Sequence, residues 1–240
     1  MRKKTILHAI VAGCAAMACA LPVCAQTWTW DGGGGNSNWS TGANWVGDVS
    51  PTNDGTALII FDGNTQLTNS VDVNWDISNL TFAASAGAFF IGGNTLTIRS
   101  GIFQLDTDTQ TVNNNITLGG SQAFWASNGN LVLGGNISMG ANNLTFGARS
   151  NITVGGVISG SGTVTMTNLG TLFLNGANIY SGTSDFKRGG VVVSGSGRIS
   201  NNAAINLGEN NGPGGSLVIS NGGWVVAGSP SFRQIGRAHV

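Results

Sequence analysis

The chain has 240 residues, of which 10 are basic and 10 acidic, so its formal net charge is zero and only 8% of its residues are charged. All three cysteines lie in the first 25 residues and the histidines are His8 and His239, so residues 26–234 contain neither type. That segment excludes disulfides, thiolate or imidazole metal sites, Ser-His-Asp triads and cysteine nucleophiles. Its six basic and ten acidic residues form no basic stripe, which argues against nucleic acid as a partner.

Residues 1–25 have the pattern of a secretory signal peptide. Basic residues at positions 2–4 precede an apolar run over 6–23 and the small residue Ala25. We expect the secretion machinery to recognise this segment and cleavage to follow Ala25. Lipidation at Cys24 or Cys19 is the weaker alternative, because the residue before Cys24 is a valine, which is larger than is usual there.

Residues 26–61 are rich in tryptophan, glycine and asparagine. Thr27–Trp30 predicts a strand, and Gly32–Gly35 predicts a loop that lacks the Lys and Ser/Thr of a phosphate-binding loop. The tryptophans have two interpretations: a platform that contacts sugars, or a hydrophobic cap over the first turn of a solenoid. We favour the cap. The residues concerned are Trp28, Trp30, Trp39 and Trp45.

A short unit recurs between Leu58 and Leu207, in the order Asn, apolar, any residue, apolar, small. This pattern predicts a short strand that directs two side chains inward, begins after Asn and ends at a small residue. Such units cannot bury their apolar face alone, so they must stack on one another. The copies begin at Asn79, Asn115, Asn130, Asn143 and Asn151.

Residues 158–195 carry the clearest pattern. Alternation predicts strands at Thr163–Thr167, Thr171–Leu174 and Val191–Val193. We expect the intervening glycines to supply the positive φ that tight corners need.

This stretch resembles the autotransporter-associated β-strand repeat of bacterial autotransporter passengers and related surface proteins. The resemblance implies a fold and a secretion route, and it implies no catalytic chemistry. The residues that carry it are Gly170, Thr171, Leu172, Leu174, Gly176, Asn178, Tyr180, Gly182, Thr183 and Gly190.

The last six residues, 235–240, read Ile-Gly-Arg-Ala-His-Val. This is the translation of ATC GGA AGA GCA CAC GTC, which resembles a common short-read sequencing adapter. We therefore expect these residues to be an artefact and the native protein to continue past about residue 234.

The expected architecture is all-β: a right-handed parallel β-helix over residues 62–234, with rungs of roughly twenty residues and no α-helix; rows of stacked asparagines at the corners would favour it. The alternative is an antiparallel β-sandwich, which also combines many short strands with frequent turns.

Paired carboxylates are the main candidates for chemistry. Asp106 and Asp108 would share a strand face, as would Asp72 and Asp76, and glycoside hydrolysis uses two carboxylates. Neither pair has a basic residue beside it in the sequence, so we expect no enzyme activity and no cofactor. Calcium binding by an Asp pair is left open.

Taken together, the sequence predicts a secreted or cell-surface structural solenoid that reaches its place through the periplasm. The resemblance implies a stalk or adhesin-like passenger whose repeat assists export and folding, with an outer-membrane barrel or an anchor segment beyond residue 234. A glycan or host-surface ligand would suit an adhesin. The alternative is a carbohydrate-binding or carbohydrate-active β-helix protein.

Overall fold

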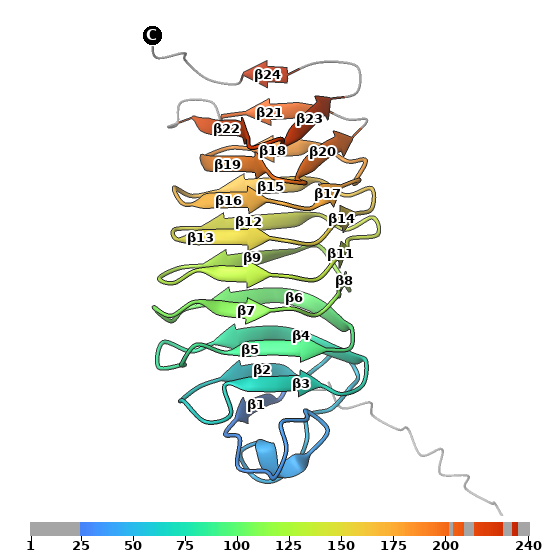
Figure 1. The fold of residues 1–240 in the computed structure, drawn as a ribbon. Helices are drawn as coiled ribbons and strands as arrows, with labels where there is room; N and C mark the ends of the chain where they lie inside the picture. Colours follow the sequence, from blue (N-terminus) through green and yellow to red (C-terminus); the bar gives the residue numbers. More distant parts are fainter. Residues whose placement is uncertain (1–24, 202–203, 209–213, 228–231, 235–240) are drawn as a thin grey trace, which may run out of the picture.

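The computed structural model describes residues 25–201, 204–208, 214–227 and 232–234. The predicted signal peptide, apart from Ala25, and residues 235–240 lie outside this part of the chain. The described residues form an elongated stack of β-strands that winds around one continuous core (Figure 1).

Three parallel sheets run along the stack. Sheet 1 consists, in order, of β1 (Thr27–Trp30), β2 (Leu58–Phe61), β4 (Trp75–Phe82), β6 (Leu96–Gln104), β9 (Gln122–Ala126), β12 (Leu144–Ala148), β15 (Val164–Thr167), β18 (Ser184–Phe186), β21 (Ile205–Leu207) and β24 (Phe232–Gln234). Sheet 2 consists of β3 (Thr68–Val71), β5 (Phe90–Gly93), β7 (Gln110–Val112), β10 (Leu131–Leu133), β13 (Asn151–Val154), β16 (Thr171–Leu174), β19 (Gly189–Ser194) and β22 (Gly215–Ser220).

Sheet 3 has shorter strands. The first residues of β4 and β6 belong to it, because β6 pairs through Leu96–Ile98 with β8 and through Gly101–Gln104 with β9. Its remaining strands are β8 (Ile116–Leu118), β11 (Ile137–Ser138) and β14 (Ile158–Ser159), which pair in succession from β6, and β17 (Ala177–Asn178), β20 (Arg198–Asn201) and β23 (Trp224–Ala227), which pair with one another. Between the two groups, the backbone N–H of Ile179 donates to the carbonyl of Ile158 at 2.9 Å.

The rungs have a regular length. Ile59, Leu80, Ile102 and Phe124 are successive partners in sheet 1, and they follow one another by 21 or 22 residues. As the chain rises in Figure 1, sheet 2 runs left to right in front and sheet 1 runs right to left behind, so the coil is right-handed. The predicted right-handed parallel β-helix with rungs of about twenty residues is confirmed.

The alternative, an antiparallel sandwich, is wrong. Strand pairs with a register are parallel in all three sheets, for example Ile152 beside Leu172 in sheet 2 and Ile137 beside Ile158 in sheet 3. Parallel neighbours require a crossover of a dozen or more residues, and the other two faces of each rung supply it.

Inward side chains stack in rows because equivalent residues of successive rungs are in register. Phe124, Phe146, Met166 and Phe186 form part of one such row in sheet 1, and each is fully buried. The residues between them on each strand point outward, as the period of two requires. One fully buried side chain of this size contributes about 1.5–3 kcal/mol.

Asparagines stack at the corners, the arrangement that favours the parallel β-helix over the sandwich. The side-chain oxygen of Asn115 accepts a hydrogen bond from the backbone N–H of Asn136 at 3.0 Å, and that of Asn136 accepts one from Val157 at 2.9 Å. Asn143 does the same for Thr163 at 2.9 Å. Each asparagine therefore satisfies a backbone donor of the next rung at a place where the sheet ladder is interrupted.

The prediction of positive φ for the glycines of residues 158–195 is confirmed at Gly160, Gly189 and Gly195, and two other corner glycines act differently. Gly176 and Gly182 do not have positive φ. A Cβ on either would instead collide with a backbone carbonyl of the preceding rung, that of Gly156 or Gly162. At these positions glycine is needed because two rungs approach closely, and the expectation of positive φ there is wrong.

Helical structure in the described residues is limited to one 3₁₀ turn, η1 (Gly42–Asn44), and they contain no α-helix, as expected. No helix in this part of the chain is long and apolar enough to cross a membrane.

Candidate functional site

The tryptophan-rich segment closes the N-terminal end of the core. Trp30, Trp39 and Trp45 are at most 1% exposed, and Trp28 is 8% exposed. The rings of Trp30 and Trp39 both meet Trp45 edge to face, with centroids 5.2 and 5.7 Å apart. Trp39 also lies 5.8 Å from Phe61, the first inward phenylalanine of the solenoid. Edge-to-face packing of this kind stabilises aromatic pairs beyond the area they bury.

Hydrogen bonds fix this cap on the first rung. The indole N–H of Trp39 donates to the side-chain oxygen of Asn69 in β3 at 2.8 Å, and that of Trp45 donates to the carbonyl of Trp39 at 2.7 Å. The side-chain amide of Gln66 donates to the carbonyls of Gly32 and Gly34 at 2.6 and 2.7 Å. The glycine loop is thus held by a residue of the following rung.

Burial decides between the two interpretations of these residues. A sugar ring can stack only on an exposed indole face, and Trp28, Trp30, Trp39 and Trp45 offer none of useful size. The expectation that they contact sugar is therefore not supported by their geometry, and their packing is that of a cap.

The residues that carry the repeat resemblance have structural places. Leu172 and Leu174 are fully buried, and the side-chain oxygen of Asn178, also buried, accepts a hydrogen bond from the backbone N–H of Ile158 at 2.9 Å. The carbonyl of Thr183 accepts from Val164 at 2.9 Å. Thr171 and Gly190 are parallel partners in sheet 2, and a Cβ on Gly170 would collide with the carbonyl of Ser150.

Tyr180 is the single tyrosine of the chain and it is 1% exposed. Its hydroxyl lies 2.6 Å from the hydroxyl of Ser184, a buried residue of β18. Burial raises the pKa of the Tyr180 phenol above its ordinary value, and the hydrogen bond with Ser184 opposes this only in part. The phenol is therefore a neutral core group at physiological pH.

The predicted carboxylate pairs do not form as pairs on a strand. Asp106 and Asp108 lie in the turn between β6 and β7, where a carboxylate oxygen of Asp106 accepts the backbone N–H of Asp108 at 2.5 Å. Asp72 follows β3 and accepts hydrogen bonds from the backbone and hydroxyl of Ser40. Asp76 lies in β4, so Asp72 and Asp76 are not on the same strand. The expectation that the two members of each pair share a strand face is therefore wrong.

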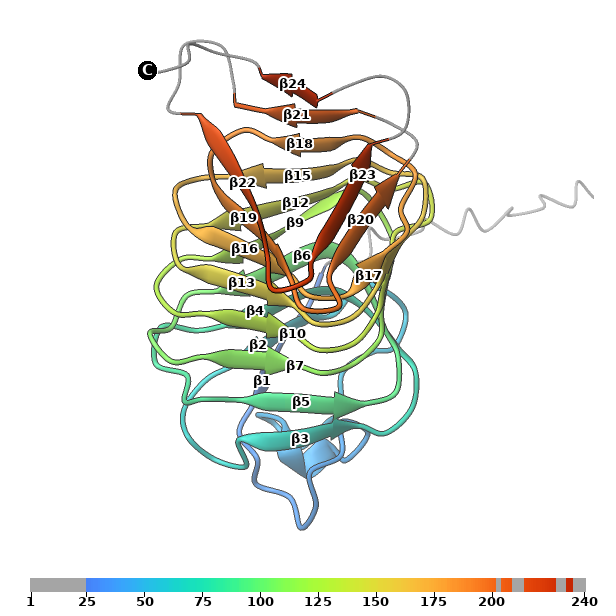
Figure 2. The same ribbon diagram turned by 45° about the horizontal axis from the view of Figure 1, so that its top comes forward.

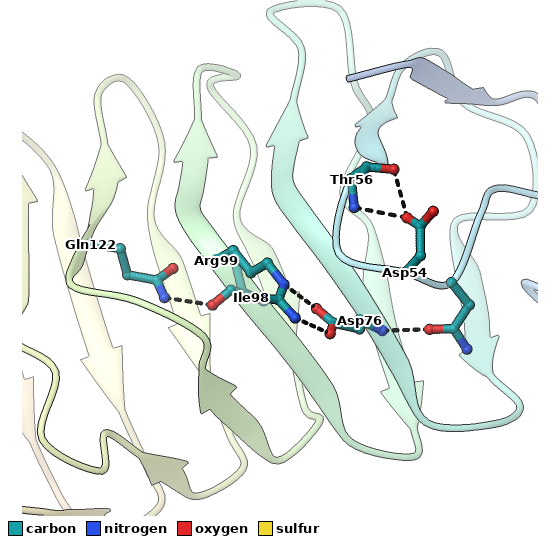
Figure 3. A network of polar contacts seen from close by, with 7 residues as sticks. Asp54, Thr56, Asp76, Ile98, Arg99 and Gln122 are labelled. Atoms are coloured by element: carbon teal, nitrogen blue, oxygen red, sulfur yellow. Dashed lines mark hydrogen bonds and ion pairs between the residues drawn. The ribbon is translucent and has the colours of Figure 1, made fainter. Parts of the chain in front are cut away.

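Asp76 has a basic partner that its sequence neighbours do not reveal. Arg99, one rung later in β6, donates from Nε and Nη2 to the two carboxylate oxygens of Asp76 at 2.8 and 2.6 Å (Figure 3). Asp76 raises the pKa of Arg99 through these bonds and its charge. The pair lies on the surface, where such ion pairs stabilise little.

Further polar contacts continue from this pair along the corner (Figure 3). The backbone N–H of Asp76 donates to Asn53 at 2.6 Å, and the Gln122 amide donates to the carbonyl of Ile98 at 2.6 Å. Hydrogen bonds from the side chain and backbone of Thr56 lower the pKa of Asp54. The Asp76–Asn53 and Gln122–Ile98 contacts join neighbouring rungs, whereas the Thr56–Asp54 contacts lie within one turn, and none of them brings a second carboxylate into hydrogen-bonding contact with Asp76. In the described ranges, no three His, Cys, Asp or Glu residues lie close enough to hold a metal ion.

A hollow that the sequence analysis did not identify lies at the corner between sheets 1 and 2. It has a volume of about 390 Å³ and is lined by Arg149, Asn168, Leu169 and Arg188. These residues lie on three successive rungs, so the rung period is the signal that could have grouped them.

Comparison with protein-family models, curated proteins and solved structures gives no significant match.

Proposed function

We propose that this chain is an exported, surface-exposed structural passenger, a rod-like stalk of the kind implied by its resemblance to autotransporter-associated repeats. The observation that supports this most is the uninterrupted parallel pairing of sheet 1 from β1 to β24, over one core. Each added rung lengthens such a rod by about 4.8 Å. A rod of this kind holds its two ends a fixed distance apart and exposes its outer side to solvent, as a stalk must.

The ends of the rod support a role for folding in export. The first rung is covered by the tryptophan cap, whereas β22 and β23 are the outermost described strands of sheets 2 and 3 (Figure 2). On these strands Ile219 is 49% exposed and Trp224 is 55% exposed. A folded rung offers its edge and side chains to the next rung, so a chain that crosses a membrane can fold progressively outside and be drawn across.

Expression with residues 1–25 in a Gram-negative host tests the proposal. We expect the protein outside the cytoplasm, with Gln26 as the first residue in its mass spectrum and a rod-shaped profile in small-angle X-ray scattering. Ala25→Leu is the matched control, because a large residue at this position should leave the leader attached. Retention of the uncleaved wild-type chain in the cytoplasm, or a compact scattering profile, contradicts the proposal.

A further inference from the structure

The hollow at the corner between sheets 1 and 2 is shaped by very short turns. Two residues join β12 to β13, three join β15 to β16 and two join β18 to β19. In Figure 1 these turns lie above one another along the left edge of the rod. Arg149, Asn168 with Leu169, and Arg188 occupy the three turns in sequence, so the middle turn separates two guanidinium groups.

The backbone of the middle turn is fixed. Asn168 adopts φ 68°, which is uncommon for a residue other than glycine. The N–H of Gly170 donates to the carbonyl of Ala148 at 2.7 Å, and its carbonyl accepts from Gly190 at 3.0 Å. Held from the rungs on both sides, the turn presents Leu169 to solvent with 73% of that residue exposed. The backbone of the middle turn is therefore held in place by hydrogen bonds within the protein.

The charge of the hollow is positive. Among the described residues, its lining contains two arginines and no acidic residue. Arg188 also takes part in another interaction, whereas the side chain of Arg149 is exposed and forms no ion pair with any described residue. Among the described residues, Asp62, Asp106 and Asp108 of the same corner lie on rungs nearer the N-terminus, the closest about 10 Å away along the rod. Asp185 in β18 lies on the rung of Arg188, and its carboxylate is 3.6 Å from the ammonium group of Lys187.

We propose that this hollow binds an acidic sugar unit, with the carboxylate of the sugar held by Arg149. A guanidinium group matches a carboxylate because it can donate two parallel hydrogen bonds. The exposed side chain of Leu169 offers an apolar surface to the C–H face of a sugar ring, and the amide of Asn168 can bond a hydroxyl. The volume is at the lower end of the range for small-molecule sites.

This inference extends the stalk proposal and does not depend on export, because it can be tested on the purified protein. Titration calorimetry at low salt with trigalacturonate should show binding. Arg149→Gln should weaken that binding by about tenfold or more, since a charge-assisted contact is worth about 1.5–3 kcal/mol. Arg149→Lys keeps the charge without the two-pronged geometry and should give an intermediate affinity.

Lys187→Gln is the matched control. Lys187 lies next to Arg188 at the same corner, does not line the hollow and is 3.6 Å from Asp185, so its loss should change affinity by less than about twofold. Equal weakening by Arg149→Gln and Lys187→Gln overturns the site, because it shows attraction by general charge. Equally tight binding of a neutral galactose trisaccharide or of inorganic phosphate also overturns the assignment, as does no binding of trigalacturonate to the wild type. Unchanged circular dichroism and melting temperature must accompany each variant.

Discussion

Replacing Trp39 by alanine should lower the free energy of unfolding of the N-terminal end by about 4 kcal/mol or more. Trp39 is fully buried and has three aromatic neighbours within 5.8 Å, namely Trp45, Phe61 and Trp75. Removal of a large aromatic side chain from such a place costs about 3–5 kcal/mol. The loss of its hydrogen bond leaves the oxygen of Asn69 without its donor, which adds about 1–3 kcal/mol.

Hydrogen exchange measured segment by segment is the assay for this change. Because each rung of a solenoid contacts mainly its neighbours, protection should fall in β1, β2 and β3 and persist in β12 and β13. Trp125→Ala is the control: Trp125 points outward from β9 and lies over Gly147, so its loss should cost less than about 2 kcal/mol. The cap interpretation is refuted if the two variants lose equal stability or if Trp39→Ala leaves the first rung protected.

Two further outcomes follow from the core and the corners. Because burial raises the pKa of Tyr180, the folded protein should show less tyrosinate absorbance near 295 nm at the same alkaline pH than the unfolded chain, which ionises near pH 10. The stability contributed by the neutral phenol is thus complete below about pH 10 and declines as the pH rises above it, which alkaline urea titrations can check; ionisation of the folded protein near pH 10 contradicts this. Gly176→Ala should cost about 1–3 kcal/mol in urea unfolding, because its Cβ meets the carbonyl of Gly156. Gly35→Ala, where no atom lies within 4 Å, should change stability by less than about 0.5 kcal/mol, and equal effects of the two substitutions would count against the close-approach argument.

Strands that span one flat face could be predicted from the sequence. The predicted bounds of Thr27–Trp30 and Thr171–Leu174 coincide with β1 and β16, because alternation extends over the whole strand. Sheet 3 could be predicted only in part: the unit that begins at Asn115 corresponds to β8 (Ile116–Leu118), whereas β11 and β14 have two residues each and show no period. β4 turns a corner within one strand, with a register shift between Ile77 and Asn79, so its alternation is interrupted.

Features that depend on contact between rungs were harder to predict. The tryptophans, by contrast, could be assigned to one cluster because they are close in sequence and could together cover an apolar end of the core. Arg99 and Asp76 are 23 residues apart, and their contact becomes visible only when the length of that rung is known. Positive φ was predicted correctly for Gly160, Gly189 and Gly195 but not for Gly176, because the close approach of Gly176 to Gly156 involves another rung and leaves no sign in the local sequence.

Because only 8% of the residues are charged, each charged side chain can be examined for the interaction that explains its position. Backbone groups are satisfied by neighbouring rungs and corner groups by asparagine, so the fold of the described residues needs no ion pair. The Arg99 and Asp76 side chains are 47% and 30% exposed, which makes their contribution to stability small as well. Arg149 is exposed, is unsupported by any described carboxylate and stabilises no turn, so its position beside an open hollow is explained better by an anionic ligand than by folding.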